Sequence, residues 1–219
     1  MRGIALALML GVLGASSALA GTIRGMVHVP DAPPDEHSFN PYAGHASSMS
    51  GHAMTARGLA TDAVLWLEAV PADADSAAPM PPRPKLAQKD QAFLPRVVVV
   101  PVGGTVDFPN LDPIYHNVFS VSPIKRFDLG KYPRGESRSV RFPKPGLVNV
   151  YCDIHSDMAG FILVAPNRIF AQPRADGTWE LPPVPPGRYT LDWWHPDFRG
   201  GHRDVELSAS NDTVVDVSF

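Results

Sequence analysis

The chain has 219 residues, with 24 prolines, 18 glycines and a formal net charge of −3. So much proline and glycine excludes a helical bundle and favours an all-β protein, whose short strands are separated by turns. The mild acidity argues against a nucleic-acid partner. The sequence has no P-loop, GxSxG, HExxH or GxGxxG motif, so the common enzyme signatures are missing and we expect no enzymatic activity.

The first twenty residues have the pattern of an export signal. Arg2 precedes an apolar run from Ile4 to Leu13, and Ala18-Leu19-Ala20 matches a small-residue cleavage site. The run is too short for a membrane span, although an uncleaved N-terminal anchor is the alternative reading. We therefore expect a periplasmic or otherwise exported protein with no membrane span, whose mature chain begins at Gly21.

Strands are predicted wherever short apolar or alternating runs lie between proline- and glycine-rich turns. Residues 31–57 form a polar loop. Residues 71–84, with prolines at four of the last six positions, predict a stiff extended linker. The four valines at 97–100 favour a largely buried strand. The predicted strands are 22–29, 63–70, 93–100, 105–108, 116–121, 137–142, 147–152, 160–164, 179–181, 188–193, 202–207 and 213–219.

Cys152 is the only cysteine, which is unusual because an exported protein normally keeps its cysteines in disulfide pairs. It begins the pattern Cys152-x-x-His155-x-x-Met158, and His116 lies upstream at the start of another predicted strand. A thiolate, two imidazoles and a weak axial thioether form the ligand set of a mononuclear blue-copper site. Loops that are distant in sequence cluster at one end of a β-sandwich, so we expect His116 to approach the loop that carries the other three side chains.

The segment from Lys85 to Ala165 resembles the plastocyanin- and amicyanin-like cupredoxins, a family of small blue-copper proteins. The resemblance rests on the short Cys-x-x-His-x-x-Met spacing and on residues 102–110, 116–119 and 145–152. It implies a Greek-key cupredoxin β-sandwich that holds one type 1 copper ion, with Asn117 beside the ligands, where it helps to organise the cysteine loop. The four implied ligands are His116, Cys152, His155 and Met158.

The ligand loop departs from the family pattern at three positions. Ile154 stands where many cupredoxins have proline, and Asp153 and Asp157 add acidic groups beside His155. The resemblance implies that this histidine lies at the surface, so we expect electrons to enter or leave through its imidazole edge. The two aspartates predict a negative rim that steers a positively charged partner; the alternative is that they only solvate the loop.

Each ligand has another explanation when it is taken alone. A lone cysteine is often a small buried hydrophobe, a methionine often packs in a core, and a histidine at a strand end often lies at the surface. Zinc is a poorer match, because structural zinc sites prefer several thiolates or imidazoles to a thioether. No orienting acid or oxyanion motif is apparent beside the cysteine, which argues against a Cys–His nucleophile. Tyr151 and Asp153 flank Cys152 where a multicopper oxidase would need histidines, so we expect no trinuclear centre.

Residues 176–191 resemble carboxypeptidase regulatory-like domains, which are prealbumin-type β-sandwiches without catalysis of their own. The chain after Val164 is short for a complete sandwich. We therefore expect the N-terminal strands to complete it around an inserted cupredoxin, as in exported methylamine-utilisation-type proteins; sequential modules are the alternative. The expected parts are a signal peptide (1–20), N-terminal strands with a His/Met-bearing loop (21–72), a Pro-rich linker (73–84), the cupredoxin domain (85–165) and a C-terminal carboxypeptidase regulatory-like part (166–219).

Together these features predict a periplasmic one-electron carrier that works with a redox protein partner of unknown identity. One alternative is a non-redox interaction module built on the second β-sandwich. Another is a copper-trafficking or copper-storage protein, which would use soft and borderline ligands in the N-terminal loop. Those ligands have no repeated spacing, which favours a plain polar loop. They are His37, His45, Met49, His52 and Met54.

Overall fold

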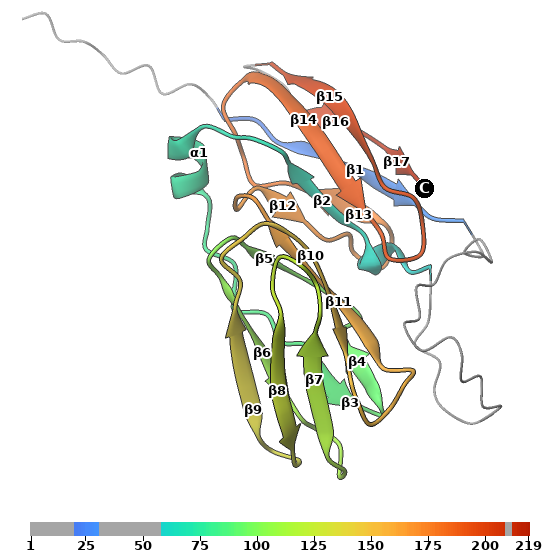
Figure 1. Cartoon of the computed structure of the whole chain (residues 1–219). Helices are drawn as coiled ribbons and strands as arrows, with labels where there is room; N and C mark the ends of the chain where they lie inside the picture. Colours follow the sequence, from blue (N-terminus) through green and yellow to red (C-terminus); the bar gives the residue numbers. More distant parts are fainter. Residues whose placement is uncertain (1–19, 31–57, 209–211) are drawn as a thin grey trace, which may run out of the picture.

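The computed structural model describes residues 20–30, 58–208 and 212–219. Within these ranges the chain forms seventeen strands, one α-helix and one turn of 3-10 helix, so the predicted all-β class is confirmed. The strands lie in two parts, one above the other in Figure 1. Nearly all of the expected export signal and the whole His/Met-bearing loop lie outside the described residues. In the part of the chain that is described, no helix is long and apolar enough to cross a membrane.

The upper part contains strands from both ends of the chain. Its elements are β1 (Ile23–His28), η1 (Ala60–Asp62), β2 (Val64–Leu67), α1 (Ala72–Ala77), β12 (Phe170–Ala171), β13 (Thr178–Glu180), β14 (Gly187–Trp194), β15 (Gly201–Leu207), β16 (Thr213–Val214) and β17 (Val217–Ser218). One sheet pairs β1 with β13, β16 and β17, and the other has the order β12-β2-β14-β15. Ile23, Trp179 and Val217 share one buried core, so residues before and after the middle of the chain stabilise each other.

The lower part is built from the middle of the chain. Its elements are β3 (Ala87–Lys89), β4 (Ala92–Leu94), β5 (Val97–Pro101), β6 (Thr105–Pro109), β7 (His116–Ser120), β8 (Phe127–Tyr132), β9 (Ser137–Arg141), β10 (Gly146–Tyr151) and β11 (Ala159–Ala165). Five strands form a sheet in the order β5-β11-β10-β7-β8, while β6 pairs with β9 and β3 with β4. Phe108, Val148 and Ile162 are fully buried in the core between these layers.

The two parts meet along β5, which explains its run of valines. Side chains alternate between the faces of a strand, so Val98 and Val100 enter the lower core while Val97 and Val99 pack toward the upper part. The latter two join Leu163 of β11 in a third buried cluster at this seam. The expected burial of this strand is therefore confirmed, because both of its faces are covered.

Three predicted segments differ from the structure. Residues 72–77 form helix α1 in place of an extended linker, because the prolines lie before and after this window and Ala74 is buried against the upper core. The strand predicted at 93–100 is divided into β4 and β5, with Pro95, which has no N–H for a strand ladder, between them. The strand predicted at 213–219 is also divided, into β16 and β17, with Val215 and Asp216 between them.

Strands β3, β8 and β12 had no sequence signal. The most important is β8, which contains Asp128, Gly130 and Lys131 and lies at the edge of the five-stranded sheet. Polar residues and glycine are depleted in ordinary strands but are tolerated on an exposed edge. Its pairing with β7 completes the sheet beside the candidate ligands.

Candidate metal centre

The β10–β11 hairpin brings three of the predicted ligands together. Tyr151 of β10 pairs with Ala159 of β11, so residues 152–158 form the loop that closes this hairpin. Cys152 directly follows β10, and Met158 directly precedes β11. His116 opens β7, which pairs with β10 through Phe119 and Tyr151. Neighbouring strands thus carry the fourth residue to the same end of the sandwich.

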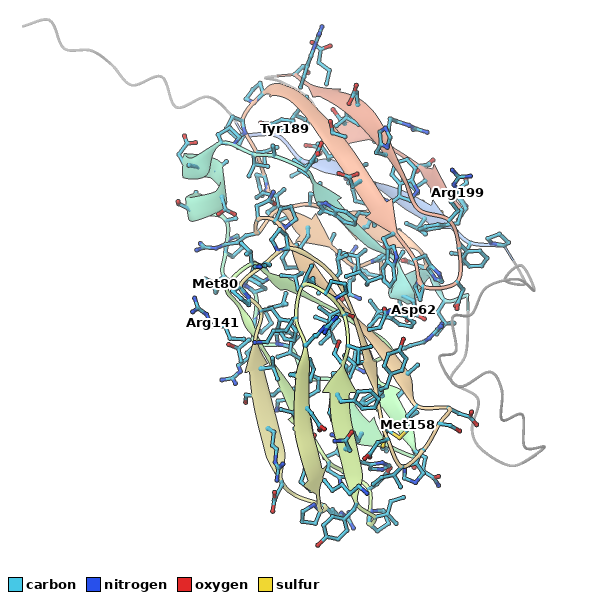
Figure 2. The ribbon with its side chains drawn as sticks, in the orientation of Figure 1. Asp62, Met80, Arg141, Met158, Tyr189 and Arg199 are labelled. Carbon is cyan, nitrogen blue, oxygen red and sulfur yellow. The ribbon has the colours of Figure 1, made fainter. Side chains whose placement is uncertain are left out.

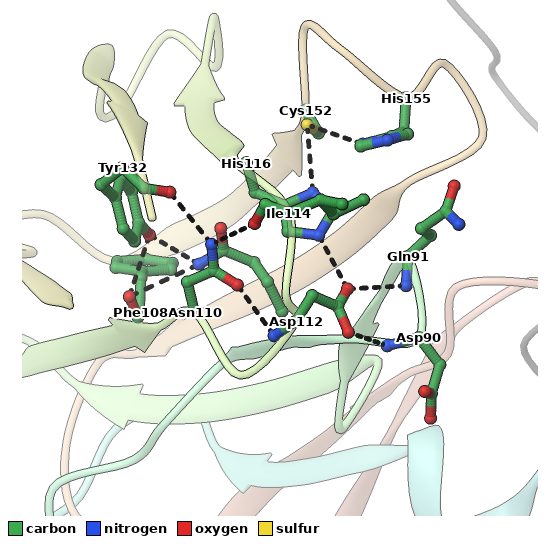
Figure 3. Close-up of polar contacts among 11 residues, drawn as sticks. Asp90, Gln91, Phe108, Asn110, Asp112, Ile114, His116, Tyr132, Cys152 and His155 are labelled. Carbon is green, nitrogen blue, oxygen red and sulfur yellow. Dashed lines mark hydrogen bonds and ion pairs between the residues drawn. The ribbon is translucent and has the colours of Figure 1, made fainter. Parts of the chain in front are cut away.

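The nitrogen and sulfur atoms of three residues converge on one point. Cys152 Sγ lies 3.9 Å from His116 Nδ1 and 3.7 Å from His155 Nδ1, as Figure 3 shows. The ligand atoms of all three residues lie within 4.8 Å of one another. Donors about 2.0–2.3 Å from a shared tetrahedral metal ion are roughly 3.5 Å apart. The spacing therefore suits coordination of a single ion by two imidazoles and one thiolate.

Burial differs between the four residues. His116 is fully buried, Cys152 and Met158 are each 1% exposed, and only His155 is partly open to solvent. Met158 belongs to the same core cluster as Cys152, and its N–H bonds to the carbonyl oxygen of His155 at 3.1 Å. The site thus excludes water on three sides and has one imidazole near the surface.

Nothing in the sequence marked Asp112 as part of this site. Its Oδ2 lies 2.7 Å from His116 Nε2, on the side of the ring that faces away from Cys152 (Figure 3). A carboxylate only accepts hydrogen bonds, so Nε2 carries the ring proton and Nδ1 keeps its lone pair toward Cys152. A metal-binding histidine commonly has such a partner, which sets its tautomer and ring orientation.

The carboxylate of Asp112 is itself held in place. It accepts hydrogen bonds from the backbone N–H groups of Asp90 at 2.6 Å and Gln91 at 2.9 Å, in the turn between β3 and β4. Burial by itself raises the pKa of Asp112, but the hydrogen bonds from Gln91, His116 and Asp90 outweigh it and hold the pKa below its usual value. Asp112 therefore stays ionised beside the imidazole near neutral pH.

Asn110 organises the loop that leads to His116. This fully buried side chain donates to the carbonyl oxygens of Ile114 at 2.9 Å and Tyr132 at 3.0 Å, and it accepts from the N–H of Asp112 at 3.0 Å. These contacts join the loop to β8. The position of the imidazole therefore depends on a buried amide that lies six residues earlier.

Asn117 makes a different contact from the one that the family resemblance implies. Its Nδ2 donates to Asp128 Oδ1 of β8 at 2.6 Å, and its buried Oδ1 has no hydrogen-bond partner among the described residues. This bond ties β7 to β8 next to the ligands. A role for Asn117 in organising the cysteine loop stays a prediction.

One of the two aspartates beside His155 has a basic neighbour, and a role for both in steering a partner stays a prediction. Asp153 Oδ2 lies 3.9 Å from the ammonium of Lys131 on β8, which offsets its charge. Ile154 is 41% exposed, and Ile114 and Tyr115 in the loop before His116 are 40% and 58% exposed. Large apolar side chains therefore accompany both loops that carry ligands.

A second group of ionisable side chains lies at the seam. The ligand atoms of Asp62, His195 and Asp197 lie within 4.8 Å of one another. Here, however, the chain provides its own cation, because Arg96 binds both oxygens of Asp197 at 2.5 and 2.7 Å. His195 Nδ1 accepts from the N–H of Asp197 and Nε2 faces the carbonyl of Leu59, each at 3.0 Å. This cluster has no ring lone pair to offer a metal ion.

Comparisons with known proteins were made for the whole chain. No family model matches it, and no curated protein gives a significant match. Among solved structures, a Cu-containing nitrite reductase (NirK) from Thermus scotoductus SA-01 is 30% identical over 38% of this chain, with a TM-score of 0.36. The match spans only 22% of that enzyme's length.

Two further matches cover nearly the whole of the other protein. A novel purple cupredoxin from Nitrosopumilus maritimus is 22% identical over 38% of this chain and 99% of its own, with a TM-score of 0.35. A reduced Cu(I) form of an amicyanin mutant is 18% identical over 46% of this chain and 97% of its own, with a TM-score of 0.36. The expected carboxypeptidase regulatory-like part has no counterpart among these matches and stays a prediction. The structures that this chain resembles are thus cupredoxins and a copper enzyme, and the similarity covers less than half of the chain.

Proposed function

We propose that this protein binds one copper ion in a type 1 site and acts as an exported one-electron carrier. The observation that carries the proposal is the approach of His116 Nδ1 and His155 Nδ1 to Cys152 Sγ, at 3.9 and 3.7 Å. A buried thioether, Met158, lies in the same cluster and completes the donor set that blue-copper sites use. The bound copper would supply a centre that changes its charge by a single electron.

The surroundings of the ligands suit that role. The thiolate of Cys152 stabilises the metal in both oxidation states, and the hairpin on either side of it limits how far the ligands can rearrange. Asp112 orients the imidazole of His116 and adds negative charge, which favours the oxidised ion. Burial of three ligands keeps water from the site. Small rearrangement and a dry site both favour rapid, reversible electron transfer.

Electrons would enter and leave through His155. Its imidazole is the only one of the two that reaches toward solvent, and Ile154 beside it is exposed. Exposed apolar side chains suit the core of an interface with a protein partner, where charged residues are depleted. The nitrite reductase match does not extend an enzymatic role to this chain, because it spans about a fifth of that protein.

The test is the visible spectrum of the copper-loaded chain. Wild-type protein should bind one copper ion and show an intense thiolate-to-copper band, with reversible one-electron voltammetry. The substitution Cys152→Ser should abolish the band, because a hydroxyl cannot replace the soft thiolate. Ser156→Ala, in the same loop, is the matched control and should leave the spectrum unchanged. A wild-type protein without the band, or a Cys152→Ser protein that retains it, would rule out the type 1 site.

A further inference from the structure

We infer that a pocket at the seam between the two parts binds an organic anion, through two arginines that come from opposite sides of the seam. The pocket has a volume of about 240 Å³ and lies between helix α1, the β5–β6 turn, the end of β9 and the residues after β11. Figure 2 shows Met80 and Arg141 next to each other in this region, well away from Met158. The inference is independent of the proposed copper function.

Arg141 is placed to present its guanidinium to the pocket. Its Nε donates to the carbonyl oxygen of Gly103 at 2.9 Å, which fixes the plane of the group. The two terminal nitrogens have no hydrogen-bond partner among the described residues. Gly103 has a φ of +81°, which favours glycine, and a Cβ there would make only an ordinary van der Waals contact with Arg141 Nη2, at 3.5 Å. The terminal N–H groups are available to a ligand because no acceptor among the described residues occupies them.

Arg168 lines the same pocket from the segment that leads into the upper part. Its backbone N–H donates to Asp75 Oδ1 at 2.7 Å, and its Nη1 makes only a long contact of 3.4 Å to the carbonyl oxygen of Ser76. The carboxylate of Asp75 also lines the pocket, with one oxygen held by that backbone N–H. Two guanidinium groups and one carboxylate give the pocket a charge of 2 − 1 = +1.

The rest of the lining indicates the class of ligand. Met80 is 65% exposed and Val102 is 41% exposed, so both present apolar surface that a ligand would cover. Asn167 contributes no recognition, because its amide is bonded to Leu67 and Ile169. Guanidinium groups bind carboxylate and phosphate oxygens in a fork-like geometry. An oxyanion with a short apolar body, such as a small carboxylic acid, fits this combination better than bare phosphate does.

The segment of the chain that contains Arg141 is rich in basic residues. Residues 124–144 carry seven Lys or Arg and two Asp or Glu, a balance of 7 − 2 = +5 in a chain of net charge −3. Arg141 lies near the end of this basic segment. Of these basic residues only Arg141 lines the pocket, whereas Lys131 lies near Asp153 at the ligand loop and Arg138 pairs with Glu136. The positive charge of the pocket therefore comes from Arg141 and Arg168 themselves.

The test is an amide NMR titration of the mature, copper-free chain with hexanoate and, separately, with inorganic phosphate. Hexanoate should shift the amides of Gly103 and Gly104 at millimolar concentration, and phosphate should do so more weakly. The double substitution Arg141→Gln with Arg168→Gln should weaken binding at least about tenfold, because each guanidinium loses its charge-assisted hydrogen bonds. Asp75→Asn should instead strengthen binding, since it removes the only acidic group in the lining.

A control variant and two contrary results test whether the anion binds in this pocket. Arg188→Gln, at a side chain that is 86% exposed on β14, should leave the affinity unchanged. The inference fails if neither anion shifts the Gly103 and Gly104 amides, or if the shifts persist in the double arginine variant. Phosphate binding as tightly as hexanoate would reject the organic ligand class and leave a simple oxyanion site. Because no copper is present, none of these outcomes bears on the type 1 site.

Discussion

Two clusters of candidate metal ligands lie among the described residues, and they differ in whether the protein itself provides a cation for them. In the lower part, His116, Cys152 and His155 turn their donor atoms toward one another. At the seam, Asp62 and Asp197 both lie near Nη1 of Arg96, which is 3.6 Å from Asp62 and bonded to Asp197. In both groups the candidate ligand atoms lie within 4.8 Å of one another. Compactness alone therefore does not distinguish a ligand set from a structural ion cluster.

Hydrogen bonding makes the distinction. The Nε2–H of His116 donates a hydrogen bond to Asp112, so the Nδ1 lone pair faces Cys152 Sγ. His195 accepts an N–H at Nδ1 and faces a carbonyl at Nε2, so both ring nitrogens are occupied by the backbone. The first arrangement leaves donor atoms that suit a metal cation. The second contains a protein cation and joins the two parts of the molecule.

The largest effect that separates the clusters should come from Arg96→Met. Removal of one partner from a buried ion pair leaves an uncompensated charge and costs about 3–5 kcal/mol of unfolding free energy. Both Asp62 and Asp197 are almost fully buried, so their carboxylates have little access to water. Urea unfolding measures the loss, and the copper band of the folded protein should be unchanged.

The matched control for this prediction is Arg188→Met. Arg188 pairs with Glu206 at 3.8 Å, but the two side chains are 86% and 72% exposed. An exposed pair of this kind contributes less than about 1 kcal/mol. Adding Asp62→Asn and Asp197→Asn to Arg96→Met should recover part of the stability. A loss from Arg96→Met no larger than the control would show that the cluster does not stabilise the seam.

Asp112→Asn should have an intermediate effect, confined to the metal centre. Loss of a carboxylate that supports a ligand histidine typically weakens metal affinity by about 10–100-fold. The carboxylate of Asp112 stabilises the oxidised ion more than the reduced one. Its removal should therefore raise the reduction potential. A tenfold difference between the two oxidation states corresponds to about 59 mV for one electron. Chelator competition and voltammetry measure the two quantities.

Asp107→Asn is the control for this metal-centre prediction. Asp107 lies on β6 of the same part, where its carboxylate accepts a hydrogen bond from Ser139 and pairs with Arg83. Its substitution should leave both the affinity and the potential unchanged. If Asp112→Asn behaves like this control, Asp112 has only a structural role in the loop.

The smallest predicted effect is a pH dependence at the seam. Burial raises the pKa of Asp62 from 3.8 to about 6; Arg96 opposes this shift and Asp197 adds to it. A carboxyl whose folded pKa lies above its unfolded pKa destabilises the folded state while it is ionised, and the penalty is relieved when a proton binds. The contribution of Asp62 to the free energy of unfolding should therefore fall as the pH rises from 4 to 6.

Asp62→Asn removes this titration, so the difference between the wild type and this variant measures it. Between pH 7 and pH 4 the wild type should gain about 2 kcal/mol relative to the Asn variant, since each pKa unit corresponds to about 1.4 kcal/mol. Urea unfolding at several pH values measures the difference. Parallel curves for the two proteins would mean that Asp62 does not titrate differently in the folded and unfolded chains.

Local sequence patterns were sufficient to predict a strand where residues adjacent in the chain determine it. Alternating and valine-rich runs predicted most of the strands, including the doubly covered β5. The proline count at 71–84 was misleading, because helix α1 needs only the proline-free window at 72–77. Polar β8 was missed, since its place at a sheet edge is decided by β7 and not by its own residues.

The metal centre also contains residues that the sequence could predict and one that it could not. The spacing of Cys152, His155 and Met158 could be read directly, because a single hairpin loop holds all three. Asp112 could not be read, because its importance depends on His116 and on a turn 21–22 residues earlier that donates to it. A carboxylate four residues before a histidine is ordinary until a buried hydrogen bond joins them.

By itself, the sequence determined the all-β class, most strand positions and the spacing of Cys152, His155 and Met158 in the candidate copper site, since each depends on residues that are close in the chain. Only the tertiary structure decided that Arg96 meets Asp62 and Asp197, that two arginines share a pocket at the seam, and that Asp112 supports His116. The physical reason is that a charge or a hydrogen bond is directed in space. Its partner is selected by strand pairing and burial, which bring together residues that no local pattern connects.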